Sequence, residues 1–96
     1  MTLQQLKYIV TVAETGTITE AANQLYISQP SLTNAIHELE KEMHITIFHR
    51  SNKGICLSKE GEDFLGYARR LLEQAAILED KYKEQDGGKT QFFLLF

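Results

Sequence analysis

The stretch that decides the fold runs from residue 17 to residue 39 and reads TITEAANQLYISQPSLTNAIHEL. Thr17 with Glu20 fits a capping box, which predicts a short helix beginning directly after Thr17. Ser28 is a second N-cap, and Pro30 falls in the first turn of the next helix, where its missing N–H costs nothing. Two capped helices joined by a tight turn predict a helix-turn-helix.

Apolar residues recur in this stretch so that they can hold the two helices together. The adjacent alanines of the first helix, Ala21 and Ala22, are small enough to let the helices cross closely. On the second helix the apolar residues are spaced by three and four, which places them on one inward face. The residues expected to fill the angle between the helices are Leu25, Ile27, Leu32 and Ile36, and those expected to face inward on the second helix are Leu32, Ala35, Ile36 and Leu39.

The polar residues of the second helix suit contact with DNA, because such a unit can place this helix in the major groove with its N-terminus leading. Gln29 and Asn34 carry amides that can pair bidentately with adenine, and the methyl group of Thr33 can meet that of thymine. Free N–H groups at the helix start can hold a phosphate. The same side chains can also form a merely solvated face, since many small helical bundles have capped helices and bind no DNA.

The elements on either side complete a winged helix-turn-helix. Upstream, Thr2 with Gln5 predicts a capped helix that ends at Gly16. Downstream, two short stretches with strand character, 45–48 and 55–57, enclose a polar turn and predict a small hairpin. The predicted fold is therefore mainly α, with a three-helix core plus a two-stranded wing, followed by a long linker helix.

The linker helix is predicted to begin after Ser58 and to reach about Lys83. Its apolar residues alternate by four and three, as in a heptad seam. The helix could pack back on its own domain, but the three-helix unit leaves little apolar surface to cover about 37 Å of helix. A partner helix is therefore favoured, in an orientation that the seam does not fix. The seam, predicted to mediate dimerisation, consists of Phe64, Ala68, Leu71, Ala75, Leu78 and Tyr82.

Three parts follow along the chain: a DNA-binding domain at residues 1–58, a linker and dimerisation helix at 59–84, and a hinge with the truncated start of an absent second domain at 85–96. The longest apolar run, 92–96, is far shorter than the ~20 residues of a membrane span. The N-terminus does not resemble a signal peptide. We therefore expect no membrane partner and a cytoplasmic location, which the single cysteine also favours.

The net charge argues against a nucleic-acid partner, whereas its distribution argues for one. Ten Lys and Arg against thirteen Asp and Glu give −3, and nucleic-acid-binding domains are usually basic. Residues 45–59, however, hold three basic residues and no acidic one. A basic hairpin suits the DNA backbone or minor groove. A second interpretation stays open, in which the chain is a dimerisation or protein-interaction module with weak or lost DNA binding.

Catalytic and metal chemistry have little support in the sequence. His37, His44 and His49 lack the spacing of a metal site, and no second cysteine joins them. We therefore expect no metal and no cofactor. No Gly-rich phosphate loop and no catalytic triad is visible, so we do not expect an enzyme. Cys56 lies in the second predicted strand, where it is expected to be buried and inert.

A longer ordered pattern spans the helix-turn-helix and the wing. It reads Ala21-Ala22-x-x-Leu25-x-Ile27-Ser28-Gln29-Pro30-Ser31-Leu32-Thr33-x-x-Ile36-x-x-Leu39-Glu40, followed by Ile45-x-Ile47-Phe48-x-Arg50 and Leu57-Ser58-x-x-Gly61. This pattern resembles the signature of the LysR-type transcriptional regulators, and the resemblance covers roughly residues 1–85.

The resemblance implies a bacterial regulator that binds double-stranded DNA as a homodimer, through antiparallel linker helices, at a pseudo-palindromic site. It implies a tetramer in the full-length parent, and a small-molecule inducer bound only by the effector domain that this chain lacks. Carried over by position, the residues at bases would be Gln29, Pro30, Thr33 and Asn34. The residues at phosphates would be Thr19 and Ser31, to which the helical His37 is added, and those of the wing would be Arg50 and Lys53.

Two residues depart from the family pattern. Asn34 stands where arginine is common, which removes a charge and some reach and puts the target DNA sequence in doubt. His44 stands where glycine is usual. A positive φ at this position would strain a histidine mildly.

Overall fold

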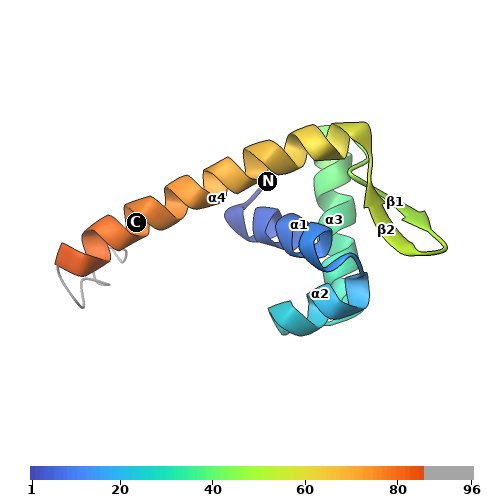
Figure 1. Cartoon of the computed structure of the whole chain (residues 1–96), viewed down its shortest axis with the longest axis horizontal. Coiled ribbons are helices and arrows are strands. Elements are labelled where there is room, and N and C mark those ends of the chain that lie inside the picture. Colours follow the sequence, from blue (N-terminus) through green and yellow to red (C-terminus); the bar gives the residue numbers. More distant parts are fainter. Residues whose placement is uncertain (86–96) are drawn as a thin grey trace.

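The computed structural model describes residues 1–85 as four helices and one two-stranded antiparallel sheet. Figure 1 shows the first three helices as a cluster, the strand pair projecting from one side, and the last helix crossing the cluster and extending away from it. This arrangement confirms the predicted winged helix-turn-helix with a long C-terminal helix. The elements are α1 (Leu3–Thr15), α2 (Ile18–Leu25), α3 (Gln29–Met43), β1 (Phe48–Ser51), β2 (Gly54–Leu57) and α4 (Lys59–Gln85).

Side-chain caps begin the first three helices at the predicted residues. The Thr2 hydroxyl accepts a hydrogen bond from the Gln5 N–H at 3.0 Å, and the Gln5 side chain accepts one from the Thr2 N–H at 3.1 Å. Thr17 accepts from the Glu20 N–H, and Ser28 from the Ser31 N–H. Each such cap contributes about 1 kcal/mol. At Thr17 only this half of the predicted capping box is formed in the structure.

Three residues in the left-handed conformation end these helices. Gly16 has a φ of 83°, as predicted from its place after α1. His44 has a φ of 58°, which confirms the backbone strain expected where a histidine replaces glycine. Tyr26 has a φ of 57° and an almost fully exposed side chain, a conformation that the sequence did not indicate.

The core lies where α1, α2 and α3 meet, under the first turns of α4. Ala21 is fully buried and Ala22 nearly so, which confirms that these small residues lie at the close contact. Leu32, Ile36 and Leu39 form the inward face of α3, as their spacing predicts. The remaining buried apolar side chains are Leu6, Ile9, Val12, Ile47, Leu65 and Ala68.

The wing begins later than predicted. Residues 45–47 are not in a strand, and β1 instead contains three of the polar residues assigned to the turn, so that only residues 52 and 53 connect it to β2. The reason is that the backbone of Ile47 is bonded elsewhere: its N–H donates to Glu40 and its carbonyl accepts from Ser58. Its side chain is fully buried in the core.

Cys56 is exposed, so the prediction that its thiol is buried was wrong. Side chains alternate across a strand. Ile55 and Leu57 therefore pack against the core while Cys56 lies on the outer face, opposite His49 of β1. The apolar composition of β2 concealed this alternation.

The long helix α4 has two different halves. Ser58 caps it by accepting from the Gly61 N–H at 2.8 Å. Leu65 and Ala68 are buried against the domain, whereas Leu71 and Leu78 are exposed. Part of the helix thus packs back on its own domain, the alternative that the sequence left open. Within residues 1–85, none of the helices combines the length and apolar content that crossing a membrane requires. Apart from its first residue, the predicted hinge at 85–96 lies outside the described residues.

Candidate nucleic-acid interface

The start of α3 presents side chains rather than a row of free N–H groups. Pro30 has no N–H, while the Ser31 N–H donates to the Ser28 hydroxyl and the Leu32 N–H to the Ser28 carbonyl. The Ser28 hydroxyl also donates to that of Ser31 at 2.8 Å. This bond leaves the Ser31 proton available to a phosphate oxygen. Gln29, Pro30 and Asn34 are exposed, and Thr33 is half-buried.

A shallow groove of about 40 Å³ joins the recognition helix α3 to the wing. Thr33 and His37 line it from α3, and Arg50 lines it from β1. The structure therefore brings together predicted residues from the three assigned sets: bases, phosphates and wing. It does not bring Lys53 or Thr19 into this groove. Lys53 lies exposed in the turn of the wing, and Thr19 is exposed in the first turn of α2.

The wing keeps its positive charge available. Among the described side chains, the ion pairs are Met1 with Glu42 and Arg69 with Glu14. Arg50 and Lys53 take part in neither. Both are exposed, so their charge can act on a phosphate backbone at short range.

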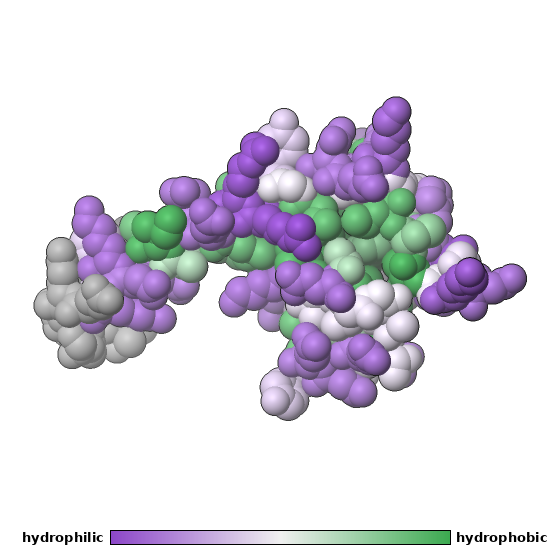
Figure 2. Space-filling view, in the orientation of Figure 1, coloured by the Kyte–Doolittle hydropathy of each residue, from purple (hydrophilic) through white to green (hydrophobic). Residues whose placement is uncertain are grey.

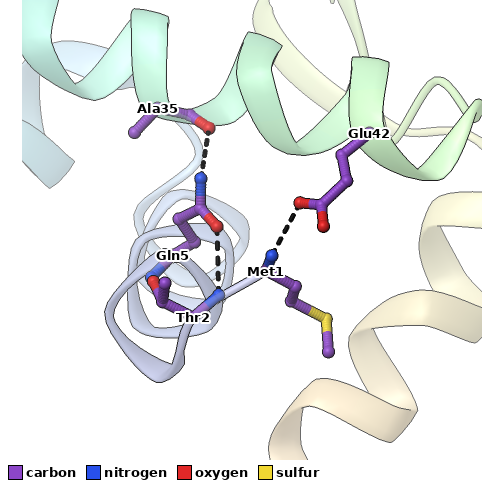
Figure 3. A network of polar contacts seen from close by, with 5 residues as sticks. All are labelled: Met1, Thr2, Gln5, Ala35 and Glu42. Atoms are coloured by element: carbon purple, nitrogen blue, oxygen red, sulfur yellow. Dashed lines mark hydrogen bonds and ion pairs between the residues drawn. The ribbon is translucent and has the colours of Figure 1, made fainter.

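The start of α1 is tied to α3 by a polar network that the sequence did not reveal (Figure 3). The Gln5 side chain donates to the Ala35 carbonyl of α3 at 3.4 Å, besides accepting from Thr2. The terminal ammonium of Met1 lies 2.6 Å from a carboxylate oxygen of Glu42. Gln5 was predicted only as a capping residue, because spacing along one helix carries no information about a bond to another.

Two of the three carboxylates at the end of α3 have partners within the chain. Glu42 pairs with Met1, and Glu40 accepts hydrogen bonds from the N–H groups of Ile47 and Phe48. Glu38 is exposed. The acidic residues that argued against a DNA partner are thus partly engaged in holding the fold together.

The predicted dimerisation seam is divided between two surroundings. Ala68 is buried in its own domain, and Phe64 packs half-buried beside it. Leu71, Leu78 and Tyr82 are exposed, and Figure 2 shows hydrophobic surface along α4 between polar side chains. Ala75, Leu72 and Leu78 of α4 line a larger groove of about 600 Å³, whose opposite wall includes Tyr8 of α1 and Leu25 at the end of α2.

Comparison with known proteins places these features in a family. The model described as "Bacterial regulatory helix-turn-helix protein, lysR family" matches residues 3–62. The chain belongs to the LysR family. The match covers the helix-turn-helix and the wing, which confirms the resemblance drawn from the sequence.

Relatives and solved structures of the LysR family agree with this assignment. The HTH-type transcriptional regulator TfdS of Cupriavidus pinatubonensis is 39% identical over 89 residues, which are 93% of this chain and 30% of that protein. The crystal structure of a CbnR_DBD–DNA complex matches with a TM-score of 0.82 at 39% identity, over 88% of this chain and 98% of that one. A BenM_DBD/catB site 1 DNA complex matches with a TM-score of 0.86 at 34% identity, over 92% of this chain and 99% of that one.

The LysR-family chain described here spans about 30% of the length of curated relatives such as TfdS. It spans nearly the whole of the two structures that contain a DNA-binding domain with DNA.

Proposed function

We propose that this chain is the sequence-specific DNA-binding module of a bacterial transcriptional regulator. The observation that carries the proposal is the groove in which Thr33 and His37 of α3 meet Arg50 of the wing. It brings hydroxyl, imidazole and guanidinium groups from two elements together. The likeness to the CbnR and BenM domains in complex with DNA supports the same conclusion.

Different parts of this surface would perform different tasks. Gln29 and Asn34, with Pro30 and Thr33, would meet base edges in the major groove, because they are the exposed or half-exposed residues of the first turns of α3. Three further residues would contact phosphates, and two residues of the wing would contact the neighbouring DNA backbone or minor groove. The phosphate set is Thr19, Ser31 and His37, and the wing set is Arg50 and Lys53.

The module would act as a homodimer through α4. Leu71 and Leu78 expose apolar surface on the half of α4 that leaves the domain, which supports pairing with the α4 of a second copy. Ala75 beside them would allow close approach. Two copies would present two α3 helices to a pseudo-palindromic site whose half-sites are spaced by helical turns. In a full-length parent, dimers would pair as a tetramer, and any inducer would bind an effector domain beyond this chain. With DNA as its partner, the module would act in the cytoplasm.

A titration with DNA tests the proposal against its alternative, a dimerisation or protein-interaction module with weak or lost DNA binding. A fluorescently labelled duplex from the region upstream of the chain's own gene is titrated at several salt concentrations, with a scrambled duplex as control. We expect tighter binding to the upstream duplex, and an affinity that falls as salt rises. Absence of salt-sensitive binding at low ionic strength, together with a dimer by light scattering, would favour the alternative.

A further inference from the structure

The carboxylate of Glu40 joins the recognition helix to the base of the wing. Its Oε2 accepts hydrogen bonds from the Ile47 N–H at 2.7 Å and from the Phe48 N–H at 3.2 Å. Phe48 is the first residue of β1, and Arg50 follows two residues later. Glu40 also lines the groove that Arg50 lines from the other side. One acidic side chain of α3 thus lies where the wing leaves the body of the domain.

The rest of the wing base is held from α4. The Ile47 carbonyl accepts from the Ser58 N–H at 2.8 Å, and the Ser58 hydroxyl donates to the Thr46 carbonyl. The Ile47 side chain is fully buried. Only the N–H side of residues 47 and 48 is held by α3, and Glu40 is what holds it. Without this carboxylate the two partly buried N–H groups lose their acceptor. They then either stay without a hydrogen bond or reach water only if the backbone moves.

We propose that Glu40 is the positioning residue of the wing: its carboxylate fixes the direction in which β1 carries Arg50 and Lys53 away from α3. The proposal rests on the proposed DNA binding for its effect on affinity. It has an unusual consequence for a carboxylate, because a negative charge near DNA ordinarily weakens binding. Glu40 would strengthen binding by aiming two cations.

Glu38 provides the matched control for the direction in which DNA affinity changes when a carboxylate is removed. It lies on the same helix, carries the same charge and is exposed, and no hydrogen bond joins it to the wing within the described residues. Replacing Glu38 by alanine removes a repulsive charge only, so affinity for DNA stays the same or rises. Replacing Glu40 by alanine removes the charge and the wing contact together, so affinity falls.

The experiment compares Glu40→Ala, Glu40→Gln and Glu38→Ala in salt titrations with the labelled upstream duplex. We expect Glu40→Ala to bind about tenfold more weakly, the size of one lost charge-assisted hydrogen bond. The slope of log affinity against log salt should become shallower by about one, as for one lost phosphate contact. Glu40→Gln keeps an acceptor oxygen and should restore most of the affinity. In an Arg50→Ala background, Glu40→Ala should cause a smaller loss of DNA affinity, because one of the two cations that Glu40 positions is already absent.

Amide hydrogen exchange without DNA separates this inference from the proposed function. Glu40→Ala should speed exchange at Ile47 and Phe48 and leave core amides such as Leu32 unchanged, whether or not the chain binds DNA. If wild type binds no DNA but exchange changes in this way, the function is wrong and the wing contact stands. Unchanged exchange, or an affinity that follows Glu38→Ala, overturns the role of Glu40. If Glu40→Ala fails to fold, Glu40→Asp takes its place, because its carboxylate is one methylene too short to reach both N–H groups, and full additivity with Arg50→Ala then contradicts the proposal.

Discussion

The backbone N–H of Ile55 donates a hydrogen bond to the carbonyl oxygen of Gly16, with 3.2 Å between nitrogen and oxygen. This bond fastens β2 to the turn between α1 and α2, whereas Glu40 holds the base of β1. Gly54 lies beside the same carbonyl, because a Cβ added there would be 2.9 Å from the Gly16 oxygen. The wing is therefore held through both of its strands and behaves as part of the domain.

Gly54→Ala should loosen this attachment. The residue has a φ of 123°, which side-chain-bearing residues rarely adopt, and the added methyl group would press on the Gly16 carbonyl. We expect the free energy of unfolding to fall by about 1–3 kcal/mol. Urea unfolding followed by circular dichroism measures the change. An unaltered midpoint would show that the backbone at residue 54 relaxes freely.

Two glycines of α4 should respond to alanine with opposite signs. A Cβ at Gly61 would lie 2.2 Å from the Ile47 carbonyl oxygen, so Gly61→Ala must push the wing base away from α4. Gly66 has open space around it, and alanine there removes only the conformational freedom of glycine. We expect Gly66→Ala to raise the free energy of unfolding by up to about 1 kcal/mol and Gly61→Ala to lower it. Equal shifts in the two unfolding midpoints would contradict the close contact.

His44→Gly should stabilise the domain. The left-handed φ of 58° at the end of α3 suits glycine, which pays no steric penalty there. We expect the free energy of unfolding, measured by urea unfolding, to rise by about 1 kcal/mol. His44→Ala is the control, because it removes the imidazole and keeps the penalty, and so should bring no gain. A gain of the same size in both variants would assign the effect to the side chain.

Gln29→Ala and Lys53→Ala should weaken DNA binding in different ways. Loss of the Gln29 amide should cost about 1–3 kcal/mol on the specific duplex and relax base preference. Loss of the Lys53 charge should weaken binding to every duplex and flatten the salt dependence. Titrations with the upstream and scrambled duplexes distinguish the two patterns. If Gln29→Ala left affinity and preference intact, the assigned recognition face would be wrong.

Leu78→Asp should weaken the proposed dimer more than Ile77→Asp. The two side chains are similarly exposed, at 60% and 54%, but only Leu78 belongs to the seam. A buried carboxylate in the seam would oppose association, so we expect Leu78→Asp to be monomeric where Ile77→Asp remains dimeric. Light scattering at tens of micromolar measures this difference. A strictly monomeric wild type under the same conditions would refute the seam.

Local features of the fold could be predicted from the sequence because they depend on residues close in the chain. Thr2, Thr17 and Ser28 cap helices whose N–H groups lie three residues away, and Gly16 ends α1 through its own backbone. The inward face of α3 follows from the helical period alone. The candidate recognition residues could be named for the same reason, as the positions that this face leaves out.

Features that depend on distant contacts could not be predicted. The start of β1 is displaced because Glu40 and Ser58 hold Ile47, and no spacing rule announces either bond. The division of α4 depends on how far the helix packs against its own domain, which buries Ala68 and leaves Leu78 exposed, and the spacing of the seam carries no information about this. The role of Glu40 could not be predicted either, because the sequence does not distinguish it from Glu38 and Glu42, which are exposed in the structure.

The attachment of α4 to the wing base has a mechanical consequence for the proposed dimer. The helix is continuous from Lys59 to Gln85, and Ser58, the residue that caps it, is bonded to Thr46 and Ile47 just before β1. A twist applied at the far end would therefore turn α3 and the wing together, as one rigid body. The distance between the two DNA-binding domains of the dimer would then be set by the angle at which the paired α4 helices cross. Control of such a regulator would act on geometry between domains rather than on the shape of either one.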